Sequence, residues 1–563
     1  MGPVSLELKP DRLLLDSNFD GYKLSLQEIP TFRKKLDVPI DPSHLTTSQY
    51  SLLHTKLFGL HNHLFGDPFE HSQAVYFVDK DLNVRKTYID DFGNEMIGPL
   101  TVWKIPSVRA RNPGDYGITL KFPSANLAVL SDGLGVLYIL STGDRTDDSD
   151  FVQLYSGEVI ACREQGFVVS DAAYRDEKKE LHVLLLHIAE DSKDRFVSVV
   201  HWVTFQEGTA DDKVTWNQTN LRQLKTKGEI QYLYLEEGCE NVYVISDSEV
   251  RFVLNSEYPI AEQAGDEDTS YKWSQSDEEV SVKFVLPERP NKELVFVAVE
   301  PKKIDVRYDA KVLLSGALAG TVDPSLMTWT IENVNSLEIS LTKSAQKIFW
   351  PELVLGNGRG EYVARSSNFD QMSEAAPQQG ATFNSQQIEE CDFESDKAFT
   401  FQRINRLTNE CTHKIHLGSH QVLLTCRSSP PLPPAVGTRH DVDVCLWQPR
   451  GTGPNFEVKH VGTLLAFGYV QASKQNRKFT GCSPDTNYCF VSESTGHIFI
   501  YKQNRPLVSS ELRHRGSGQR FKSVAQQQVL NLANQQILGV LASDAHLFVL
   551  GEDFITAFKV GNE

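Results

Sequence analysis

Short apolar runs separated by polar turns dominate the chain. A recurring unit consists of one apolar run, a short polar turn and a second apolar run. Asp, Ser and Gly suit tight turns, and the flanking β-branched and aromatic residues suit half-buried strands, so each unit predicts a β-hairpin. A hairpin cannot bury its own apolar face, and repeated hairpins must therefore stack on one another or close into a ring. The five units span residues 74–89, 126–140, 241–254, 487–501 and 546–560.

The distribution of these units predicts an all-β fold. Three units lie before residue 260 and two after residue 480, which favours a WD40-like β-propeller built from residues 1–260 and 396–563. If these two parts close one propeller, the residues between them are an insertion in a loop that joins two blades. The alternative is a series of unrelated sandwich hairpins, because the units have neither a strict spacing of about 40 residues nor a Trp-Asp signature.

Two shifts in composition bracket the middle of the chain. The first is strongly acidic, and self-repulsion predicts an extended, solvated linker at residues 261–270. The second, rich in Gly, Ser, Gln and Glu, predicts a flexible linker at residues 356–395. A third segment, residues 428–437, is rich in proline, and we interpret it as an ordinary loop in preference to an SH3 ligand.

The segment between the linkers, residues 271–355, has the clearest alternation of polar and apolar positions. Val280, Val282, Phe284 and Leu286 occupy every second position and are followed by proline, which predicts a strand with one face inward. About five more short strands follow, with turns expected at residues 300–301, 319–320 and 323–324. Seven or so short antiparallel strands in a segment of this length predict a β-sandwich.

The order of motifs in this segment resembles the CS domain, the sandwich shared by p23-type and NudC-type cochaperones. Residues 22–26 (YKLSL) and 439–449 (RHDVDVCLWQP) extend the resemblance to NudC-type proteins beyond the sandwich. The motifs, in chain order, are Trp273-Ser-Gln, Val-x-Val-x-Phe-x-Leu-Pro, Leu314-Ser-Gly-x-Leu, Val322-Asp, Trp329-Thr-Ile, Leu337-Glu-Ile-Ser-Leu-Thr-Lys and Trp350-Pro-x-Leu.

This resemblance implies a protein-interaction module without catalytic activity. CS domains of these families bind proteins, several of them Hsp90 and its clients, so we expect chaperone machinery or client proteins as partners. Trp273, Trp329 and Trp350 match the aromatic positions of the motif, and we expect them in the core because a Trp that anchors strand packing needs no ligand.

Four basic residues of the sandwich are candidates for an exposed, partner-binding charged patch. The alternative is a solvated face with no partner, since charged strand positions usually serve solubility. These candidates are Lys283, Lys302, Lys303 and Arg307.

Charge, apolar runs and cysteine spacing argue against several classes of protein. The chain has 563 residues and a formal net charge of −18, which disfavours non-specific binding to nucleic acid or to an anionic membrane. No segment approaches the ~20 consecutive apolar residues that span a bilayer, and no secretion signal is recognisable. The eight cysteines contain no C-x-x-C pair, which predicts reduced thiols. These features predict a soluble, intracellular protein, and we expect a monomer. The resemblance to NudC-type proteins implies a location in the cytoplasm, with the nucleus as a second location.

Motifs for catalysis or for cofactor binding do not stand out. The Gly-x-Ser-x-Gly and phosphate-loop patterns are absent from the sequence, so we expect neither an enzyme nor a bound cofactor. Three groups of residues resemble metal ligands by composition. Strand alternation would separate the side chains of the group that contains Cys411, although a turn at residues 418–419 could bring two or three of them together. The groups are Cys411, His413, His416 and His420; His61, His63 and His71; and His440, Asp441 and Asp443, of which the last is interpreted as a half-exposed strand.

Two other functions remain open. A basic stretch at residues 474–478, with Phe479 beside it, could contact RNA or an acidic protein, because RNA modules place aromatic residues among Lys and Arg. A propeller enzyme that uses the central channel is supported only by analogy of fold. Other basic and aromatic residues that belong to the first alternative are Arg513, His514, Arg515, Arg520, Phe521 and Lys522.

Overall fold

The structure is a computed structural model in which β-strands form nearly all of the regular secondary structure. Two α-helices, α1 (Leu52–Gly59) and α2 (Phe467–Ala472), occur in the described part of the chain, and neither is long and apolar enough to cross a membrane. The structure describes residues 3–561 apart from 17–18, 70–73, 91, 94, 107–108, 160–165, 192–194, 211–212, 259, 261–270, 287–290, 310, 333–335, 345–349, 351–352, 356–359, 363–397, 419, 475, 495, 507–522 and 534.

Several predictions from the sequence fall on residues outside these ranges. The acidic linker at 261–270 lies outside them, as does most of the linker predicted at 356–395. His71 and the basic residues between 513 and 522 also lie outside the described residues. Six described cysteines are free thiols, namely Cys239, Cys411, Cys426, Cys445, Cys482 and Cys489.

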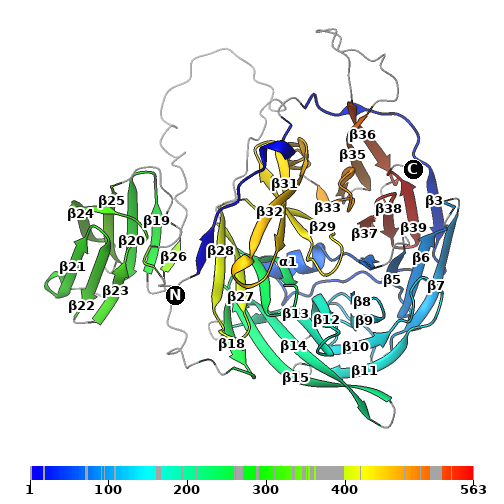
Figure 1. Ribbon diagram of the computed structural model, residues 1–563, viewed down its shortest axis with the longest axis horizontal. Helices are drawn as coiled ribbons and strands as arrows, with labels where there is room; N and C mark the ends of the chain where they lie inside the picture. Colours follow the sequence, from blue (N-terminus) through cyan, green and yellow to red (C-terminus); the bar gives the residue numbers. More distant parts are fainter. Residues whose placement is uncertain are drawn as a thin grey trace, which may run out of the picture. The chain divides into compact units, whose positions relative to one another are not determined.

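Seven sheets of the described residues form the blades of a β-propeller (Figure 1). In each blade the first strand lies next to the channel and the later strands follow outward. Blade 1 consists of β4 (Phe65–Gly66), β5 (Val75–Val78), β6 (Asn83–Ile89) and β7 (Met96–Lys104), and blade 2 of β8 (Thr119–Ser124), β9 (Leu127–Ser131), β10 (Val136–Ser141) and β11 (Val152–Glu158). Blade 3 consists of β12 (Val168–Arg175), β13 (Glu180–Glu190), β14 (Phe196–Ala210), β15 (Lys213–Thr226) and β18 (Arg251–Asn255). Blade 4 consists of β16 (Ile230–Leu235), β17 (Asn241–Ser246), β27 (Phe399–Asn405), β28 (Cys411–Gly418) and β1 (Val4–Leu6).

The remaining three blades come from the carboxy-terminal part of the chain and from its first 35 residues. Blade 5 consists of β29 (Val422–Cys426), β30 (Ala435–His440), β31 (Asp443–Arg450) and β32 (Glu457–Leu464). Blade 6 consists of β33 (Arg477–Cys482), β34 (Tyr488–Glu493), β35 (His497–Pro506), β36 (Ser523–Asn531) and β2 (Lys23–Leu24), and blade 7 of β37 (Ile537–Ala542), β38 (His546–Gly551), β39 (Phe554–Lys559) and β3 (Thr31–Lys35).

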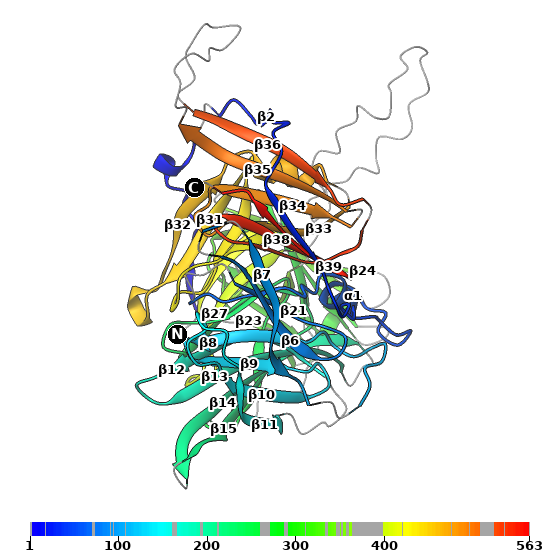
Figure 2. The ribbon, with the colours of Figure 1, turned by 90° about the vertical axis from the view of Figure 1, so that its right-hand side faces the viewer.

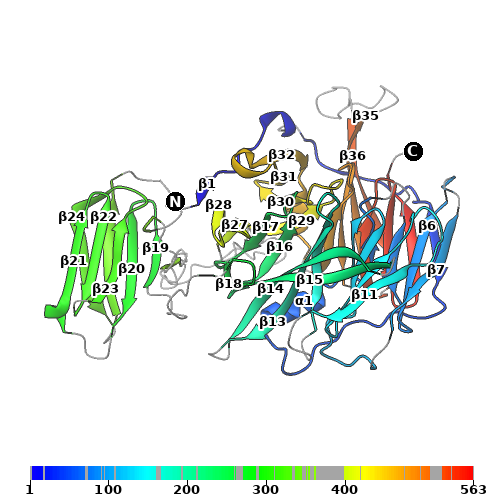
Figure 3. The ribbon, with the colours of Figure 1, turned by 60° about the horizontal axis from the view of Figure 1, so that its bottom comes forward.

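The amino-terminal segment closes the ring and lines the outer edge of other blades. β3 pairs antiparallel with β39 and thereby completes blade 7. β1 adds in parallel to β28, and β2 adds in parallel to β36 (Figures 2 and 3). Tyr22 anchors this segment, because its Oη donates to the Leu465 carbonyl over 2.5 Å and accepts from Gln503 Nε2 over 2.8 Å.

The inserted segment follows a strand of blade 3 and precedes a strand of blade 4. After β17 the chain adds β18 to the outer edge of blade 3, where β18 pairs antiparallel with β15, and it later returns as β27 of blade 4. The predicted hairpin at 241–254 is therefore wrong, because β17 and β18 belong to different blades. The insertion lies in the connection between β18 of blade 3 and β27 of blade 4. The physical reason why β18 leaves β17 is that β15 has an edge with unpaired backbone groups, which β18 covers. In this pairing Arg222 of β15 lies opposite Asn255 of β18.

The other four predicted hairpins are confirmed. They correspond to β5–β6, β9–β10, β34–β35 and β38–β39, each pair antiparallel. The interpretation of residues around His440 as one half-exposed strand is wrong, because β30 ends at His440 and β31 begins at Asp443. Asp441 turns the chain with a positive φ of 53°, a conformation that Asp tolerates better than most residues.

The sandwich consists of two sheets around one apolar core. The five-stranded sheet has the order β24 (Val322–Glu332), β25 (Ser336–Lys343), β20 (Glu279–Val285), β19 (Tyr271–Gln275) and β26 (Gly360–Tyr362). The three-stranded sheet has the order β21 (Val295–Glu300), β22 (Lys303–Tyr308) and β23 (Lys311–Ala317). Val280, Val282 and Phe284 are fully buried in the core, as their alternation predicts. The turn expected at 323–324 is instead an irregularity of register within β24, which pairs with β25 on both sides of it.

Three histidines are buried in blade 3 of the propeller. His182, His187 and His201 lie on β13 and β14, and the rings of His187 and His201 stack with their centroids 5.1 Å apart. Burial lowers the pKa of His187 to about 3, with the charge of His201 as a smaller cause, and lowers the pKa of His201 and of His182 to about 4. These imidazoles are therefore neutral in the folded protein near pH 7.

We expect the propeller to lose stability as the pH falls from 6.5 towards 4. In that range the unfolded chain binds protons at these histidines and the folded chain does not, so the stability present above pH 6.5 is lost on acidification. The loss is on the order of 1 kcal/mol per histidine and pH unit. Guanidinium unfolding at several pH values measures it. The double variant H187Q/H201Q should show a shallower pH dependence than the wild type, and equal slopes would contradict this assignment.

Candidate functional site

The outer face of the three-stranded sheet carries a compact set of exposed side chains. Strand register aligns Phe296, Arg307 and Val312 in one row across β21, β22 and β23. Two further rows follow along the strands, and nearly all of these residues are exposed because they alternate with inward-facing ones such as Val297 and Val306. We call this surface the three-stranded face; its other members are Ala298, Asp305 and Ser315 in the second row, and Glu300, Lys303 and Ala317 in the third.

Two apolar side chains stand at one end of this face. Phe296 is 53% exposed and Val312 is 50% exposed. The guanidinium of Arg307 lies between them in the row: it is 5.9 Å from the centroid of the Phe296 ring and donates to both carboxylate oxygens of Asp305 over 3.1 and 2.6 Å. The face therefore combines exposed apolar area, one oriented ion pair and small side chains that allow another backbone to approach.

The structure separates the four basic residues that the sequence singled out. Lys303 and Arg307 lie on the three-stranded face, and Lys302 lies in the turn that leads into it. Lys283 lies on β20 of the other sheet, where its ammonium is 3.9 Å from Glu338. Outward positions of the two sheets in a sandwich point in opposite directions, so Lys283 does not join the other three. The sequence analysis did not single out Phe296 and Val312. The alternation along residues 295–300 nevertheless indicates that Phe296 lies on the outer face of its strand, while Val295 and Val297 lie on the inner face.

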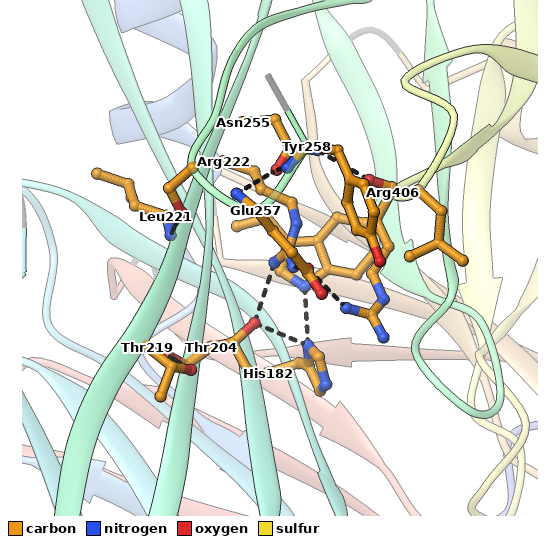
Figure 4. Close-up of polar contacts among 12 residues, drawn as sticks. His182, Thr204, Thr219, Leu221, Arg222, Asn255, Glu257, Tyr258 and Arg406 are labelled. Carbon is orange, nitrogen blue, oxygen red and sulfur yellow. Dashed lines mark hydrogen bonds and ion pairs between the residues drawn. The ribbon is translucent and has the colours of Figure 1, made fainter. Parts of the chain in front are cut away.

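A second feature is the cluster of charges at the point where the chain leaves the propeller (Figure 4). The carboxylate of Glu257 accepts from two guanidinium groups, Arg222 of β15 and Arg406 of the turn after β27, the latter over 3.1 Å. The side chain of Arg222 is fully buried, whereas that of Glu257 is 28% exposed. Asn255 adds to this cluster, since its Nδ2 donates to the Arg406 carbonyl over 2.8 Å and to Asn409 Oδ1 over 2.6 Å.

Arg222 continues this cluster into the core of blade 3. Its Nη1 donates to Thr204 Oγ1 over 3.0 Å, and its guanidinium lies 5.4 Å from the Trp202 ring centroid. Trp202 Nε1 in turn donates to His182 Nδ1 over 3.2 Å. These polar groups thus tie the point where the chain leaves the propeller to two adjacent blades.

The propeller has a central channel lined by its inner strands. This channel encloses about 1260 Å³. Of the predicted basic stretch, Arg477 and Lys478 line the channel, while Lys474 lies 4.3 Å from the centroid of the Phe499 ring. Phe479 is buried in a core cluster, so it is not an exposed platform for a base.

The predicted metal ligands do not converge in the described part of the chain. Among described residues, no group of three or more His, Cys, Asp or Glu side chains could together hold a metal ion. His413 and His416 point to opposite faces of β28, and Asp443 accepts from the backbone N–H of Ala466 over 2.6 Å. The rings of His61 and His63 meet edge to face with their centroids 4.5 Å apart, and His71 lies outside the described residues.

Comparisons with known proteins identify the sandwich and the family of the chain. Residues 269–343 match the family of CS domains. A curated relative, NudC domain-containing protein 1 of Xenopus laevis, is 33% identical over the whole of both chains. The chain belongs to the NudC domain-containing protein 1 family. The relative of the same name from Mus musculus is 30% identical, again over the whole of both chains. A solved structure, the nuclear movement protein from E. cuniculi GB-M1, is 24% identical, and the match covers 15% of this chain and 99% of that one with a TM-score of 0.14.

Membership in the NudC domain-containing protein 1 family indicates a cochaperone-like role in protein interaction. Of the three tryptophans that match the CS motif, Trp273 and Trp350 are buried in the sandwich core, and Trp329 packs against it from the outside. Trp350 is also held by polar contacts, because its backbone N–H donates to Gln275 Oε1 over 2.9 Å and its carbonyl accepts from Gln275 Nε2 over 2.8 Å. Lys343 Nζ donates to the same Gln275 Oε1 over 2.8 Å.

We expect W350A to destabilise the sandwich by about 3–5 kcal/mol, because the substitution removes a buried aromatic side chain and leaves a cavity. Hydrogen exchange of the amides in β20 and β25 measures this change without interference from the propeller. W329A should cost less, because Trp329 is only partly buried. Equal effects of the two substitutions would show that Trp350 does not have this central position.

We expect E257Q to destabilise the propeller by about 2–4 kcal/mol, since it leaves the buried guanidinium of Arg222 without its charged partner. The matched control is E249Q, which removes the partner of Arg251 in an exposed ion pair and should cost less than about 1 kcal/mol. Chemical unfolding of the full chain measures both. Similar values for the two variants would argue against a structural role for the cluster at Glu257.

Proposed function

We propose that this chain is a non-catalytic adaptor of the cochaperone type, which binds partner proteins through the CS sandwich and through the propeller. Two binding surfaces on one chain raise the effective concentration of one partner near the other. Membership in the NudC domain-containing protein 1 family supports the cochaperone part of this proposal. The surfaces of the two folds support the adaptor part.

The observation that carries the proposal is the exposure of Phe296 and Val312 on the three-stranded face. Scattered exposed apolar residues need no explanation, but these two occupy one row with Arg307 between them. Aromatic and arginine side chains are the residues that most often dominate protein–protein interfaces. The small side chains of Ala298, Ser315 and Ala317 leave the rest of the face flat enough for close packing.

We propose that this face binds an Hsp90-type chaperone. The resemblance of the sandwich to the CS domains of p23-type and NudC-type cochaperones supports this choice of partner. Arg307 can be shared with a carboxylate of the partner, because it already presents a fork of donors in a fixed orientation through Asp305.

The test is the affinity of purified full-length protein for purified Hsp90, measured by isothermal titration calorimetry. We expect F296S and R307E each to raise the Kd at least tenfold, because an interface commonly depends on a few central residues. Both side chains are exposed, so the fold should tolerate the substitutions.

The matched control is V285S. Val285 lies at the end of β20 in the other sheet and is 78% exposed, more than Phe296. The control should bind Hsp90 as the wild type does. The proposal is overturned if F296S and R307E bind with wild-type affinity, or if V285S weakens binding as much as they do.

A further inference from the structure

The strands that line the channel of the propeller run in the same direction. Its wall is formed by inner strands of the blades, and these run side by side. Cys426 Sγ, at the end of β29, lies 3.7 Å from the Ser483 carbonyl at the end of β33, and Lys478 Nζ at the start of β33 donates to the Ile537 carbonyl at the start of β37 over 2.9 Å. Neighbouring inner strands therefore begin at one mouth of the channel and end at the other.

Three cationic side chains of the channel wall have N–H donors that no hydrogen bond within the described residues uses. Lys121 of β8 makes no hydrogen bond or ion pair of 4 Å or less to another described residue. Burial lowers the pKa of Lys121, and the charge of Asp171 on the adjacent β12 offsets part of that effect. Lys478 donates only to the Ile537 carbonyl, and Arg427 only to the Asp67 carbonyl over a long 3.4 Å, within the described residues. All three line the channel.

The carboxylates of the wall are largely engaged within the protein. Glu229 forms an ion pair with Lys56 at 2.6 Å. Glu236 forms an ion pair with Arg403 at 2.6 Å and also accepts from Tyr243 Oη over 2.9 Å. Asp171 accepts from the backbone N–H of Leu235 over 2.8 Å. Of the other carboxylates that line the channel, Asp176 pairs with Lys179 at 2.7 Å, and Glu237 forms no ion pair within the described residues. Lys121, Lys478 and Arg427 also form none, so the cations without an ion pair outnumber the carboxylates without one.

The pKa of His61 reflects the positive charges around it. The imidazole lines the channel, and its buried Nε2 has no hydrogen-bond partner. Burial and, to a smaller extent, the charges of Arg111, Lys478 and Lys121 lower the pKa of His61 to about 4. The imidazole of His61 is therefore neutral near pH 7 and adds no charge to the wall of the channel.

Apolar side chains lie in the same channel. α1 contributes Leu53 and Leu57, and Leu60, which directly follows α1, is 52% exposed. The proline-rich segment that the sequence analysis interpreted as an ordinary loop contributes residues 430–434, including Leu432. The volume of the channel also exceeds the ~300–1,000 Å³ of typical small-molecule sites.

We propose that the channel is a docking site for an extended acidic peptide segment of a partner protein. Carboxylates of the segment would pair with Lys478, Lys121 and Arg427, and its apolar side chains would pack against α1 and the proline-rich loop. This proposal goes beyond binding at the three-stranded face and concerns the propeller alone.

The spacing of the cations favours a peptide over a compact polyanion. Lys478 lies near the start of β33 and Arg427 directly after the end of β29, so about five residues of strand, roughly 15 Å, separate their levels along the channel. A single phosphate cluster would call for cations that converge on one point. An extended peptide rises by about the same distance per residue as a β-strand. It can therefore place one carboxylate at the level of Lys478 and another at the level of Arg427. Neither nucleic acid bases nor inositol phosphates need the apolar surface of α1.

The test uses the full-length protein and a fluorescein-labelled peptide of twelve residues in which eight Glu and four Leu are interspersed, followed by fluorescence anisotropy. We expect saturable binding that weakens as the salt concentration rises, because the contacts are charge pairs. The variant K121Q/R427Q should raise the Kd at least tenfold. Lys121 has no hydrogen bond to lose, so K121Q alone keeps the fold and should raise the Kd about threefold or more.

Two comparisons make the result specific. K213Q/K459Q removes two lysines that are exposed outside the channel, and it should bind the peptide as the wild type does. A peptide with Gln in place of Glu should bind at least tenfold more weakly. The proposal is overturned if the acidic peptide does not bind, if K121Q and K121Q/R427Q bind it with wild-type affinity while retaining the wild-type melting temperature, or if a labelled oligonucleotide or inositol hexakisphosphate binds the channel more tightly than the peptide. Because Hsp90 is absent from this assay, failure here leaves binding at the three-stranded face unaffected.

Discussion

The propeller depends on the requirement that each blade be covered on both of its faces. A sheet that is apolar on both faces is stable only between two neighbours, so the series of blades has no acceptable first or last member and must close. Closure occurs where one core cluster joins Val75 and Phe77 of blade 1 to Phe548 and Leu550 of blade 7. The edge strand β3 adds backbone hydrogen bonds to this closure, since it belongs to the beginning of the chain and pairs antiparallel with β39 near the end.

A closed ring also explains how β18 and a whole sandwich fit between two strands of one blade. The strands on either side of the insertion recover their contacts: Arg403 of β27 pairs with Glu236 next to β17, and Asn405 Nδ2 donates to Asn241 Oδ1 over 3.0 Å. Glu257 then joins two guanidinium groups from adjacent parts of the propeller at the exit of the inserted chain. Contacts between residues far apart in the sequence thereby hold the blade together. The entropic cost of closing a loop rises only slowly with its length, so a long insertion weakens these contacts little.

The two candidate surfaces differ in physical character. The three-stranded face is an open sheet surface with exposed apolar side chains, where affinity would come from packing and from one oriented arginine. The channel is concave and carries unpaired cations in a protein whose formal net charge is −18. Placing positive charge inside a concave wall concentrates it, since low-dielectric walls focus the field. An acidic partner would therefore meet attraction at the channel, while most of the remaining surface repels it.

Local pattern in the sequence determined the strands, four of five hairpins, the inward residues of the sandwich and the all-β class, because alternation and turn residues act over a few positions. The family membership also followed from motifs whose order is visible in one dimension. Tertiary structure alone decided that β18 leaves β17 for the edge of blade 3, and that Lys283 faces away from Lys303 and Arg307. It alone brought Lys121, Arg427 and Lys478 to one channel, although hundreds of residues separate them. Strand partners and shared cavities are set by which edges and faces remain uncovered after the whole chain has folded, and that information is not contained in any short segment.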